Sequence, residues 1–366
     1  MTDQHYMRLA LEQAWKGCGF VNPNPMVGAV LVKNDHVIGR GAHERYGGPH
    51  AEQNAIDDCS GNLEGATLYV TLTPCCHFGK TPPCTEAILK SGIKRVVVGA
   101  HDPNPLVAEK SIEMLRQHGV EVATDVLRQE CDALNAAFFH FIRTRTPYVI
   151  LKYAMTMDGK IATVSGKSKW ITGETARERV HQDRKRYTAI MTGIGTIMAD
   201  DPLLTCRIPE GRDPVRIVCD TTLRIPLTAR VVKTAHRTRT IIATSSDEKK
   251  RSRLCEAGCE ILMVPAENNR LDLKALMKQL GEMNIDSVLQ EGGPRLNSAA
   301  LESGIVNKVQ AYIAPKLFGG QHAQTPVGGN GVDLPRKAWH LSAPVITQLG
   351  QDILLESEVL PCLQES

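Results

Sequence analysis

Short apolar runs alternate with amphipathic segments along the chain, and this alternation restricts the fold more than any other feature. In the first half, two apolar runs joined by Asn34 and Asp35 predict a β-hairpin. The full pattern predicts helices over 6–18, 50–59, 84–91, 109–118 and 127–145, and strands over 26–32, 36–43, 67–72, 94–100 and 120–126. This order predicts a mixed sheet flanked by helices.

A second alternating run begins after Thr146 and Pro147. It predicts strands over 147–155, 189–193, 215–220, 240–245, 260–265, 287–292 and 309–315, with helices between them. A chain of 366 residues is long enough for two domains that each bury a core. We therefore predict two α/β domains, at 1–146 and 147–366.

Composition narrows the class of protein. The formal net charge of +3 gives no argument for nucleic acid, and no apolar run approaches the roughly 18 residues of a membrane span. The first residues lack the pattern of a secretory signal. Eleven scattered cysteines, an odd number, do not form a disulfide framework in a chain of this length. We expect a cytoplasmic protein with reduced thiols.

The densest chemical signal is TPCCHFGKTPPC at 73–84, together with GGPHAEQNAI at 47–56. Catalytic zinc needs three protein ligands and one open position for water. His50 and two of the cysteines can supply the ligands, and Glu52 can move protons without binding the metal. The alternative is a structural zinc site, which a fourth ligand would close and which would not need Glu52.

Position within the segment selects the cysteines. Cys75 follows the strand at 67–72, and Cys84 opens the next helix, where the helix dipole favours a thiolate. We interpret Cys76 as a packing residue, because neighbouring side chains point apart. His77 is either a pocket residue or an ordinary loop histidine.

The His-Ala-Glu motif followed by Pro-Cys and a further Cys resembles the cytidine deaminase superfamily. Eight residues separate Cys75 from Cys84, whereas ordinary base deaminases have two between their cysteines. With NPNPMVGAV at 22–30 and the second half of the chain, the segment closely resembles the bifunctional riboflavin biosynthesis deaminase-reductases. The resemblance implies a three-layer α/β/α deaminase domain, with Asn24, His43 and Lys80 contacting substrate; an ordinary loop position is the alternative for each.

The second half contains no G-x-G-x-x-G fingerprint after a strand. It offers LQEGGPRLNSAAL at 289–301, where two glycines precede a helix start that can receive a phosphate. With MTMDGKIATVSGKSKWITG at 155–173 and TGIGTIMADDPLLTCR at 192–207, this half resembles the reductase domain of the same family. That resemblance implies a fold similar to dihydrofolate reductase, which binds NADPH across the ends of a central sheet.

The reductase resemblance also implies site residues. The positions that would contact NADPH are Ala154, Trp170, Thr196, Asp200, Thr221, Gly293, Pro294, Arg295, Leu296, Asn297, Ser298 and Ala299. The positions that would contact substrate are Ser168, Arg184, Leu204, Arg207 and Glu291. Guanidinium groups suit a ribose phosphate because they bind it in a bidentate manner. We expect Lys152 with Asp200 to handle the proton in reduction; an exposed ion pair is the alternative.

Together these observations predict a riboflavin biosynthesis enzyme with one zinc ion per chain, NADPH as second cofactor and a small phosphorylated pyrimidine substrate. His50, Cys75 and Cys84 are the expected zinc ligands. The family resemblance further suggests a homo-oligomer. One rival is a zinc nucleobase or tRNA deaminase whose second domain only binds, which would need a strongly basic surface. Another is a zinc-stabilised nucleotide-binding module without catalysis.

Overall fold

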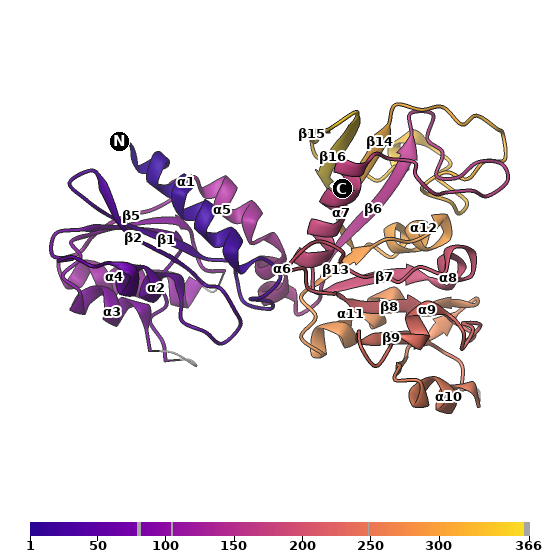
Figure 1. Cartoon of the computed structure of the whole chain (residues 1–366), viewed down its shortest axis with the longest axis horizontal. Helices are drawn as coiled ribbons and strands as arrows, with labels where there is room; N and C mark the ends of the chain where they lie inside the picture. Colours follow the sequence, from indigo (N-terminus) through magenta and orange to yellow (C-terminus); the bar gives the residue numbers. More distant parts are fainter. Residues whose placement is uncertain (79–81, 104, 248, 362–366) are drawn as a thin grey trace. The chain divides into compact units, whose positions relative to one another are not determined.

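The computed structural model describes residues 1–78, 82–103, 105–247 and 249–361, apart from the side chains of 105–108. It divides into two compact units, Met1–Arg145 and Thr146–Ser366, each with a sheet of its own (Figure 1). Within the described part of the chain, the helices are too short or too polar for any of them to span a bilayer.

The first unit has a five-stranded sheet in the order β2-β1-β3-β4-β5. Strand β1 runs antiparallel to β2 and β3, while β3, β4 and β5 are parallel. Figure 1 shows α1 and α5 on one face and α2, α3 and α4 on the other. The elements are α1 (Asp3–Ala14), η1 (Trp15–Gly17), β1 (Gly28–Lys33), β2 (His36–Ala42), α2 (Ala51–Asp58), β3 (Thr67–Leu72), α3 (Cys84–Lys90), β4 (Arg95–Ala100), α4 (Pro105–Gln117), β5 (Glu121–Ala123), α5 (Arg128–Leu134) and α6 (Ala136–Thr144).

The predicted mixed sheet between two helical layers is confirmed. The hairpin of β1 and β2 turns at Asn34 and Asp35, whose φ angles of 50° and 61° suit the tight turn that strand twist favours. Two glycines of β2 let α2 lie directly on the sheet. A side chain on Gly41 would come within 2.1 Å of the carbonyl oxygen of Ala51, and one on Gly39 within 2.5 Å of that of Ala55. This close contact fixes the start of α2.

The single helix predicted over 127–145 is wrong, because the chain forms α5 and α6 with a break at Asn135. Asn135 leaves the helical region with φ −112° and ψ 22°. Its buried side chain accepts a hydrogen bond from the backbone N–H of Met26 and donates one to the carbonyl of the same residue, both at 2.9 Å. These bonds join residues 109 positions apart, so the local pattern could not reveal the break. Strand β5 is also shorter than predicted, and α4 begins four residues earlier, at a proline that suits a first helical turn.

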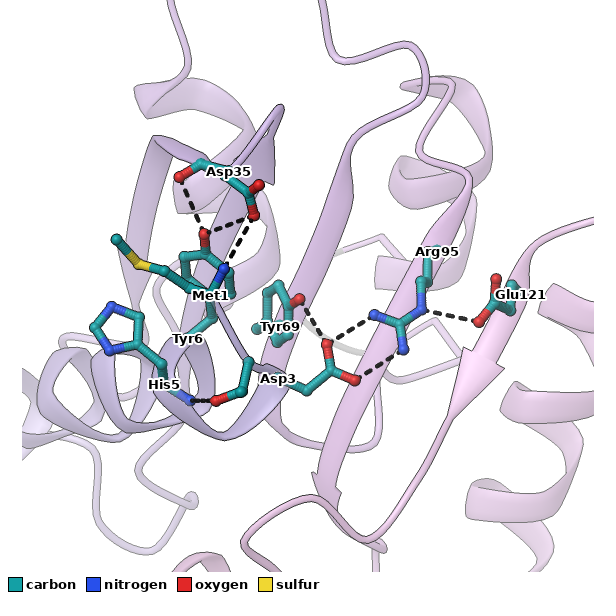
Figure 2. Close-up of polar contacts among 9 residues, drawn as sticks. Met1, Asp3, His5, Tyr6, Asp35, Tyr69, Arg95 and Glu121 are labelled. Atoms are coloured by element: carbon teal, nitrogen blue, oxygen red, sulfur yellow. Dashed lines mark hydrogen bonds and ion pairs between the residues drawn. The ribbon is translucent and has the colours of Figure 1, made fainter.

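A charged network joins α1 to three strands at the end of the sheet where β4 and β5 begin (Figure 2). The guanidinium of Arg95 donates two parallel hydrogen bonds of 2.8 Å to the Asp3 carboxylate, and its Nε donates to Glu121 at 2.9 Å. The hydroxyl of Tyr69 donates to Oδ1 of Asp3 at 2.8 Å, and this oxygen also accepts from Nη1 of Arg95. The hydrogen bond from Arg95 is the main reason that the pKa of Asp3 lies below its usual value.

The second unit has a nine-stranded sheet in the order β10-β9-β8-β7-β13-β6-β14-β16-β15. All neighbours from β10 to β14 are parallel, and the last two strands run antiparallel. The elements are β6 (Tyr148–Thr156), α7 (Glu174–Arg186), β7 (Ala189–Gly193), α8 (Ile194–Asp200), β8 (Val215–Cys219), α9 (Arg230–Lys233), β9 (Thr240–Thr244), α10 (Lys250–Glu256), β10 (Glu260–Met263), β11 (Ala266–Glu267), β12 (Arg270–Leu271), α11 (Leu273–Glu282), β13 (Ser287–Gln290), α12 (Pro294–Glu302), β14 (Val306–Ala314), η2 (Pro335–Lys337), β15 (Val345–Leu349) and β16 (Asp352–Glu358).

Each of the seven strands predicted in this unit is present, but the hairpin of β15 and β16 was not predicted. Its signal is an alternating sequence on both sides of Gly350, which turns with φ 65°. Since neighbours from β10 to β14 are parallel, their carboxyl ends share one edge of the sheet. In such sheets ligands bind at that edge.

We expect Arg95→Met to destabilise the first unit by about 1 kcal/mol, because Asp3 loses its paired guanidinium. A carboxylate with a lowered pKa stabilises the fold above its ordinary pKa and stops doing so as pH falls through the lowered value. The difference between wild type and variant should therefore be largest near neutral pH and vanish in acid. Urea unfolding across the pH range measures it.

Lys90→Met is the matched control for this prediction. Lys90 pairs with Glu86 at 3.2 Å, but the two side chains are 78% and 41% exposed. Solvent screens such a pair, so its loss should cost less than about 0.5 kcal/mol at any pH. Equal losses in the two variants would contradict the role given to the Asp3 network.

Candidate active sites

His50 and Glu52 lie at the start of α2, the helix that the glycines of β2 hold against the sheet. His50 is the N-cap, with extended backbone at φ −75° and ψ 165°, and Glu52 is the second helical residue. Both side chains line one cavity, and Glu52 is only 3% exposed. The first turn of α2 therefore brings an imidazole and a carboxyl group to the same place.

The two predicted cysteines come from a different segment. Cys75 lies in the loop after β3, and Cys84 is the first residue of α3. The backbone N–H of Cys84 donates to Sγ of Cys75 at 3.4 Å, and the N–H of Thr85 donates to the Cys75 carbonyl at 3.1 Å. These bonds close the loop so that both sulfurs approach His50. Cys76, interpreted as a packing residue, is half-buried.

The donor atoms of His50, Cys75 and Cys84 all lie within 4.8 Å of one another. Nδ1 of His50 is 3.3 Å from Sγ of Cys84 and 3.5 Å from Sγ of Cys75. Usual Zn–N and Zn–S bond lengths in a tetrahedron put such donors about 3.5–3.8 Å apart. One imidazole and two thiols at these separations fit a zinc ion with one position left for water. They do not need Glu52 as a ligand.

Electrostatics around the three donors favour a charged thiol and a protonatable carboxyl group. A hydrogen bond from Cys84 is the main cause that lowers the pKa of Cys75 to about 4, whereas the same bond raises the pKa of Cys84. Burial raises the pKa of Glu52 to about 7, with a further rise from the negative charge of Cys75. Glu52 can therefore both take up and release a proton near neutral pH.

The cavity around this cluster has a volume of about 320 Å³. Asn24, His43 and His77 are among its lining residues. Nδ1 of His43 donates to the Pro49 carbonyl at 3.0 Å, so its Nε2 is free to accept from the Asn24 amide at 3.3 Å. Burial lowers the pKa of His43 and keeps it neutral. Lys80, the third predicted substrate contact, lies outside the described residues.

In the second unit, most predicted site residues lie at the carboxyl edge of the parallel strands. Thr196 is in α8 after β7, Thr221 follows β8, and Glu291 follows β13. Thr221 is held there through its carbonyl, which accepts from the Thr244 hydroxyl at 3.0 Å. Ala154 is near the end of β6, and Trp170 is in the loop between β6 and α7.

Lys152, Arg184 and Glu291 form a nearly buried cluster. Gln290 of β13 pairs with Leu151 of β6, which sets Lys152 beside Glu291 with Nζ and Oε2 3.7 Å apart. Arg184 of α7 donates to both Glu291 oxygens at 2.8 and 2.9 Å. Burial alone would raise the pKa of Glu291, but Arg184 and Lys152 outweigh it and bring this pKa to about 2. Burial lowers the pKa of Lys152, against the effect of Glu291.

The remaining predicted substrate and proton-handling residues lie outside this cluster. Asp200 ends α8 and accepts from the Ser168 hydroxyl at 3.2 Å, so the structure pairs Lys152 with Glu291 and Asp200 with Ser168. Leu204 is buried with φ 55°. Arg207 is exposed, and its Nε donates to Nε2 of His181 at 3.2 Å.

The turn that begins at Gly293 opens α12 with Pro294 in its first turn. A side chain on Gly293 would lie 3.7 Å from the Thr196 hydroxyl, so α8 and this turn adjoin. Two predicted cofactor contacts have their side chains engaged within the protein. Asn297 donates to the Pro326 carbonyl at 2.8 Å and accepts from Gln290 at 3.1 Å, and Ser298 donates to Glu302 at 2.5 Å. The turn therefore offers a phosphate its backbone N–H groups. Arg295 is exposed, whereas Leu296 and Ala299 are half-buried.

Comparisons with known proteins identify a matching family for each of the two units. Residues 147–355 match the family described as RibD C-terminal domain, and residues 1–100 match the cytidine and deoxycytidylate deaminase zinc-binding region. The riboflavin biosynthesis protein RibD of Actinobacillus pleuropneumoniae is 54% identical over 361 residues, covering 98% of this chain and 96% of the relative. This chain belongs to the RibD family.

Solved structures of RibD proteins support the same conclusion. RibD of Acinetobacter baumannii superposes with a TM-score of 0.86 at 37% identity, covering 98% of this chain and 99% of that one. A Thermotoga maritima protein described as a diaminohydroxyphosphoribosylaminopyrimidine deaminase and 5-amino-6-(5-phosphoribosylamino)uracil reductase gives 0.85 at 38%, with the same coverage. The predicted family, a bifunctional deaminase and reductase of riboflavin biosynthesis, is confirmed. So is the fold class, a cytidine deaminase-like unit followed by a dihydrofolate reductase-like unit.

Sequence reasoning missed two residues around the cluster of this RibD chain, Tyr312 and His181. Tyr312 of β14 places its ring centroid 5.3 Å from Nζ of Lys152, and its hydroxyl donates to Asp183 at 3.1 Å. His181 lies one helical turn before Arg184. His181 and Arg184 are three residues apart on a polar helix and so share one face, which could have indicated that the histidine lies near the site. Tyr312 could not be found, because its place depends on the register of β14 against β6.

We expect Glu291→Gln to destabilise the second unit of this RibD chain by about 3 kcal/mol, because two cations lose their shared counter-charge where water cannot replace it. The side chains of Lys152 and Arg184 are each 13% exposed, and that of Glu291 is 14% exposed. Urea unfolding measures the loss.

Glu260→Gln is the matched control, since Glu260 accepts the same paired bonds from Arg239, at 2.8 and 2.9 Å. Those side chains are 47% and 42% exposed, so the expected loss is below about 1 kcal/mol. A loss for Glu291→Gln as small as the control's would show that the cluster does not depend on this carboxylate.

Proposed function

We propose that the first unit hydrolyses the 2-amino group of 2,5-diamino-6-(5-phosphoribosylamino)pyrimidin-4(3H)-one, giving 5-amino-6-(5-phosphoribosylamino)uracil. The second unit then reduces the ribosyl group to ribityl with NADPH, giving 5-amino-6-(5-phosphoribitylamino)uracil. The single observation that carries the proposal is the convergence of His50, Cys75 and Cys84 beside a buried Glu52 in a RibD-family chain. The deaminase and reductase activities by which the Thermotoga maritima protein is described support the substrate assignment.

His50, Cys75 and Cys84 would hold one zinc ion per chain. When bound, zinc lowers the pKa of a water molecule toward neutrality and so supplies the nucleophile. Glu52 would take one proton from the water and give it to the ring nitrogen as the C–O bond forms. It would then take the remaining hydroxyl proton and give it to the amino group, which leaves as ammonia when the C–N bond breaks. Its raised pKa, about 7, supports both steps. Asn24 and the neutral His43 orient the pyrimidine by hydrogen bonds in a cavity of about 320 Å³, and Lys80 binds the phosphate.

We expect Glu52→Gln to lower the rate of ammonia release by at least about a hundredfold, because glutamine keeps the size of the side chain but cannot carry the proton. The zinc content of the purified protein, measured by elemental analysis, should not change. Cys84→Ser is the control, and it should lose zinc as well as activity. Ammonia release by Glu52→Gln at the wild-type rate would remove the proposed role, and loss of zinc would make Glu52 a ligand.

In the second unit, NADPH supplies the hydride. Arg184 already donates hydrogen bonds from all three of its guanidinium nitrogens. Nε and Nη2 donate to the Glu291 carboxylate, and Nη1 donates to the Thr205 carbonyl. The exposed Arg207 is therefore the better candidate for the ribose phosphate, while Arg184 orients Glu291. The ion pair of Lys152 with Glu291 supports Lys152 as the proton donor, with Glu291 in the place predicted for Asp200. The remaining contacts with substrate and NADPH come from Asp200, Ser168, Leu204 and the residues from Gly293 to Ala299.

We expect Lys152→Met to reduce NADPH oxidation by about a hundredfold while ammonia release continues at the wild-type rate, because the reduction loses its proton donor. Lys308→Met is the control, since Lys308 lies in the adjacent strand β14 and pairs with Glu356 at 3.1 Å. It should keep both activities. Parallel assays of ammonia and NADPH on one substrate preparation give the result, and unchanged NADPH oxidation in Lys152→Met would refute the assignment.

A further inference from the structure

Trp170 has an exposed side chain and an unusual backbone conformation. Its side chain is 69% exposed, yet its backbone has φ 64°, in the left-handed region that a bulky residue seldom adopts. Such a conformation is strained and persists only where neighbouring groups hold it. The contacts of Trp170 therefore indicate what the conformation serves.

Lys316 holds the peptide groups around Trp170. This lysine follows β14, and its Nζ donates to the carbonyl of Trp170 at 3.0 Å and to that of Ile171 at 2.8 Å. One ammonium group thus binds two successive carbonyls of a strained turn. Hydrogen bonds from a charged donor are the stronger kind, which suits a contact that must offset backbone strain.

Arg177 holds the ring of the same residue. The carbon of its guanidinium lies 4.3 Å from the centroid of the Trp170 ring, within the range of a cation–π contact. Nη1 of Arg177 also donates to the Thr172 carbonyl at 2.8 Å, which ties the guanidinium to the turn. The indole is therefore fixed from one side while most of its surface stays open to solvent.

The loops that carry Trp170 and Lys316 are joined at further points. Figure 1 shows the loops that follow β6 and β14 side by side at the upper right. Met157 donates to the Lys316 carbonyl at 2.9 Å, and Ile161 donates to that of Gln324 at 2.9 Å. The carboxylate of Asp158 accepts from the N–H of Gly319 at 2.7 Å. Trp170 thus stands on a pair of loops bound to each other.

We propose that Lys316 and Arg177 are positioning residues that hold Trp170 as a preformed platform for an aromatic ring of NADPH. The inference rests on the proposed NADPH site and assigns new residues to it. A ring that stacks on an indole already fixed in place does not have to order that side chain, so binding avoids the cost of immobilising it. Loss of either holding residue leaves the indole free, and cofactor binding then has to order it.

The test uses the full-length protein and NADPH itself. Reduced nicotinamide absorbs where tryptophan emits, so NADPH bound near Trp170 quenches its fluorescence. The chain has three tryptophans, and comparison of wild type with Trp170→Phe isolates the signal of Trp170. Titration of Lys316→Met should give a Kd for NADPH about fivefold higher than wild type. The KM for the pyrimidine substrate at saturating NADPH should stay within about twofold.

Three further variants separate positioning from general stability. Lys316→Arg keeps a charged donor and should restore binding to within about twofold of wild type. Arg177→Met should weaken NADPH binding and shift the emission of Trp170 without bound cofactor. Lys337→Met removes an exposed lysine whose partner is Asp333, at 3.0 Å, and should leave binding unchanged.

Two results would overturn the inference, and they are distinguishable. If NADPH quenches Trp170 in the wild type but binds Lys316→Met with unchanged affinity, the holding role is wrong and the cofactor site stands. If NADPH quenches wild type and Trp170→Phe equally, the cofactor does not lie near Trp170, and both the platform and that part of the proposed function fail.

Discussion

Both candidate sites depend on side chains from separate strands, loops and helix starts that the backbone brings close together. In the first unit, the loop after β3 and the first turns of α2 and α3 bring sulfur, nitrogen and carboxyl groups within a few ångströms. In the second, Lys152 within β6 and Glu291 just after β13 bring an ammonium and a carboxylate together. Convergence of this kind requires close backbone packing, which explains why α2 rests on glycine positions of β2.

The cluster of His50, Cys75 and Cys84 could be predicted from the sequence because its signal is local. His50 and Glu52 are two residues apart, and Cys75 and Cys84 lie in one short segment, so the motif contains most of the site. The structure brings these side chains close to one another, and Asn24 and His43 line the same cavity. The alternation of apolar runs likewise predicted most strands of both sheets, since each run spans one strand and needs no knowledge of its neighbours.

Features set by distant contacts could not be predicted in the same way. The break at Asn135 depends on bonds to Met26, and the pairing of Lys152 with Glu291 depends on the register of β6 against β13. We predicted Asp200 as the partner of Lys152 because we expected Lys152, Asp200 and Glu291 at strand ends or in the loops around the site, a criterion that does not distinguish one carboxylate from the other. Asn297 and Ser298 show the same limit, because their motif position suggests ligand contacts while their side chains bond within the protein.

Glu52 and Glu291 show how environment gives one residue type opposite proton affinities. Glu52 lies beside a thiol that carries negative charge, and burial raises its pKa to about 7. Glu291 lies between two cations that bring its pKa to about 2. The first can exchange a proton at neutral pH, and the second stays an anion throughout. For the proposed reduction, Glu291 is therefore a poor proton donor, whereas its neighbour Lys152 has a removable proton and a pKa lowered by burial.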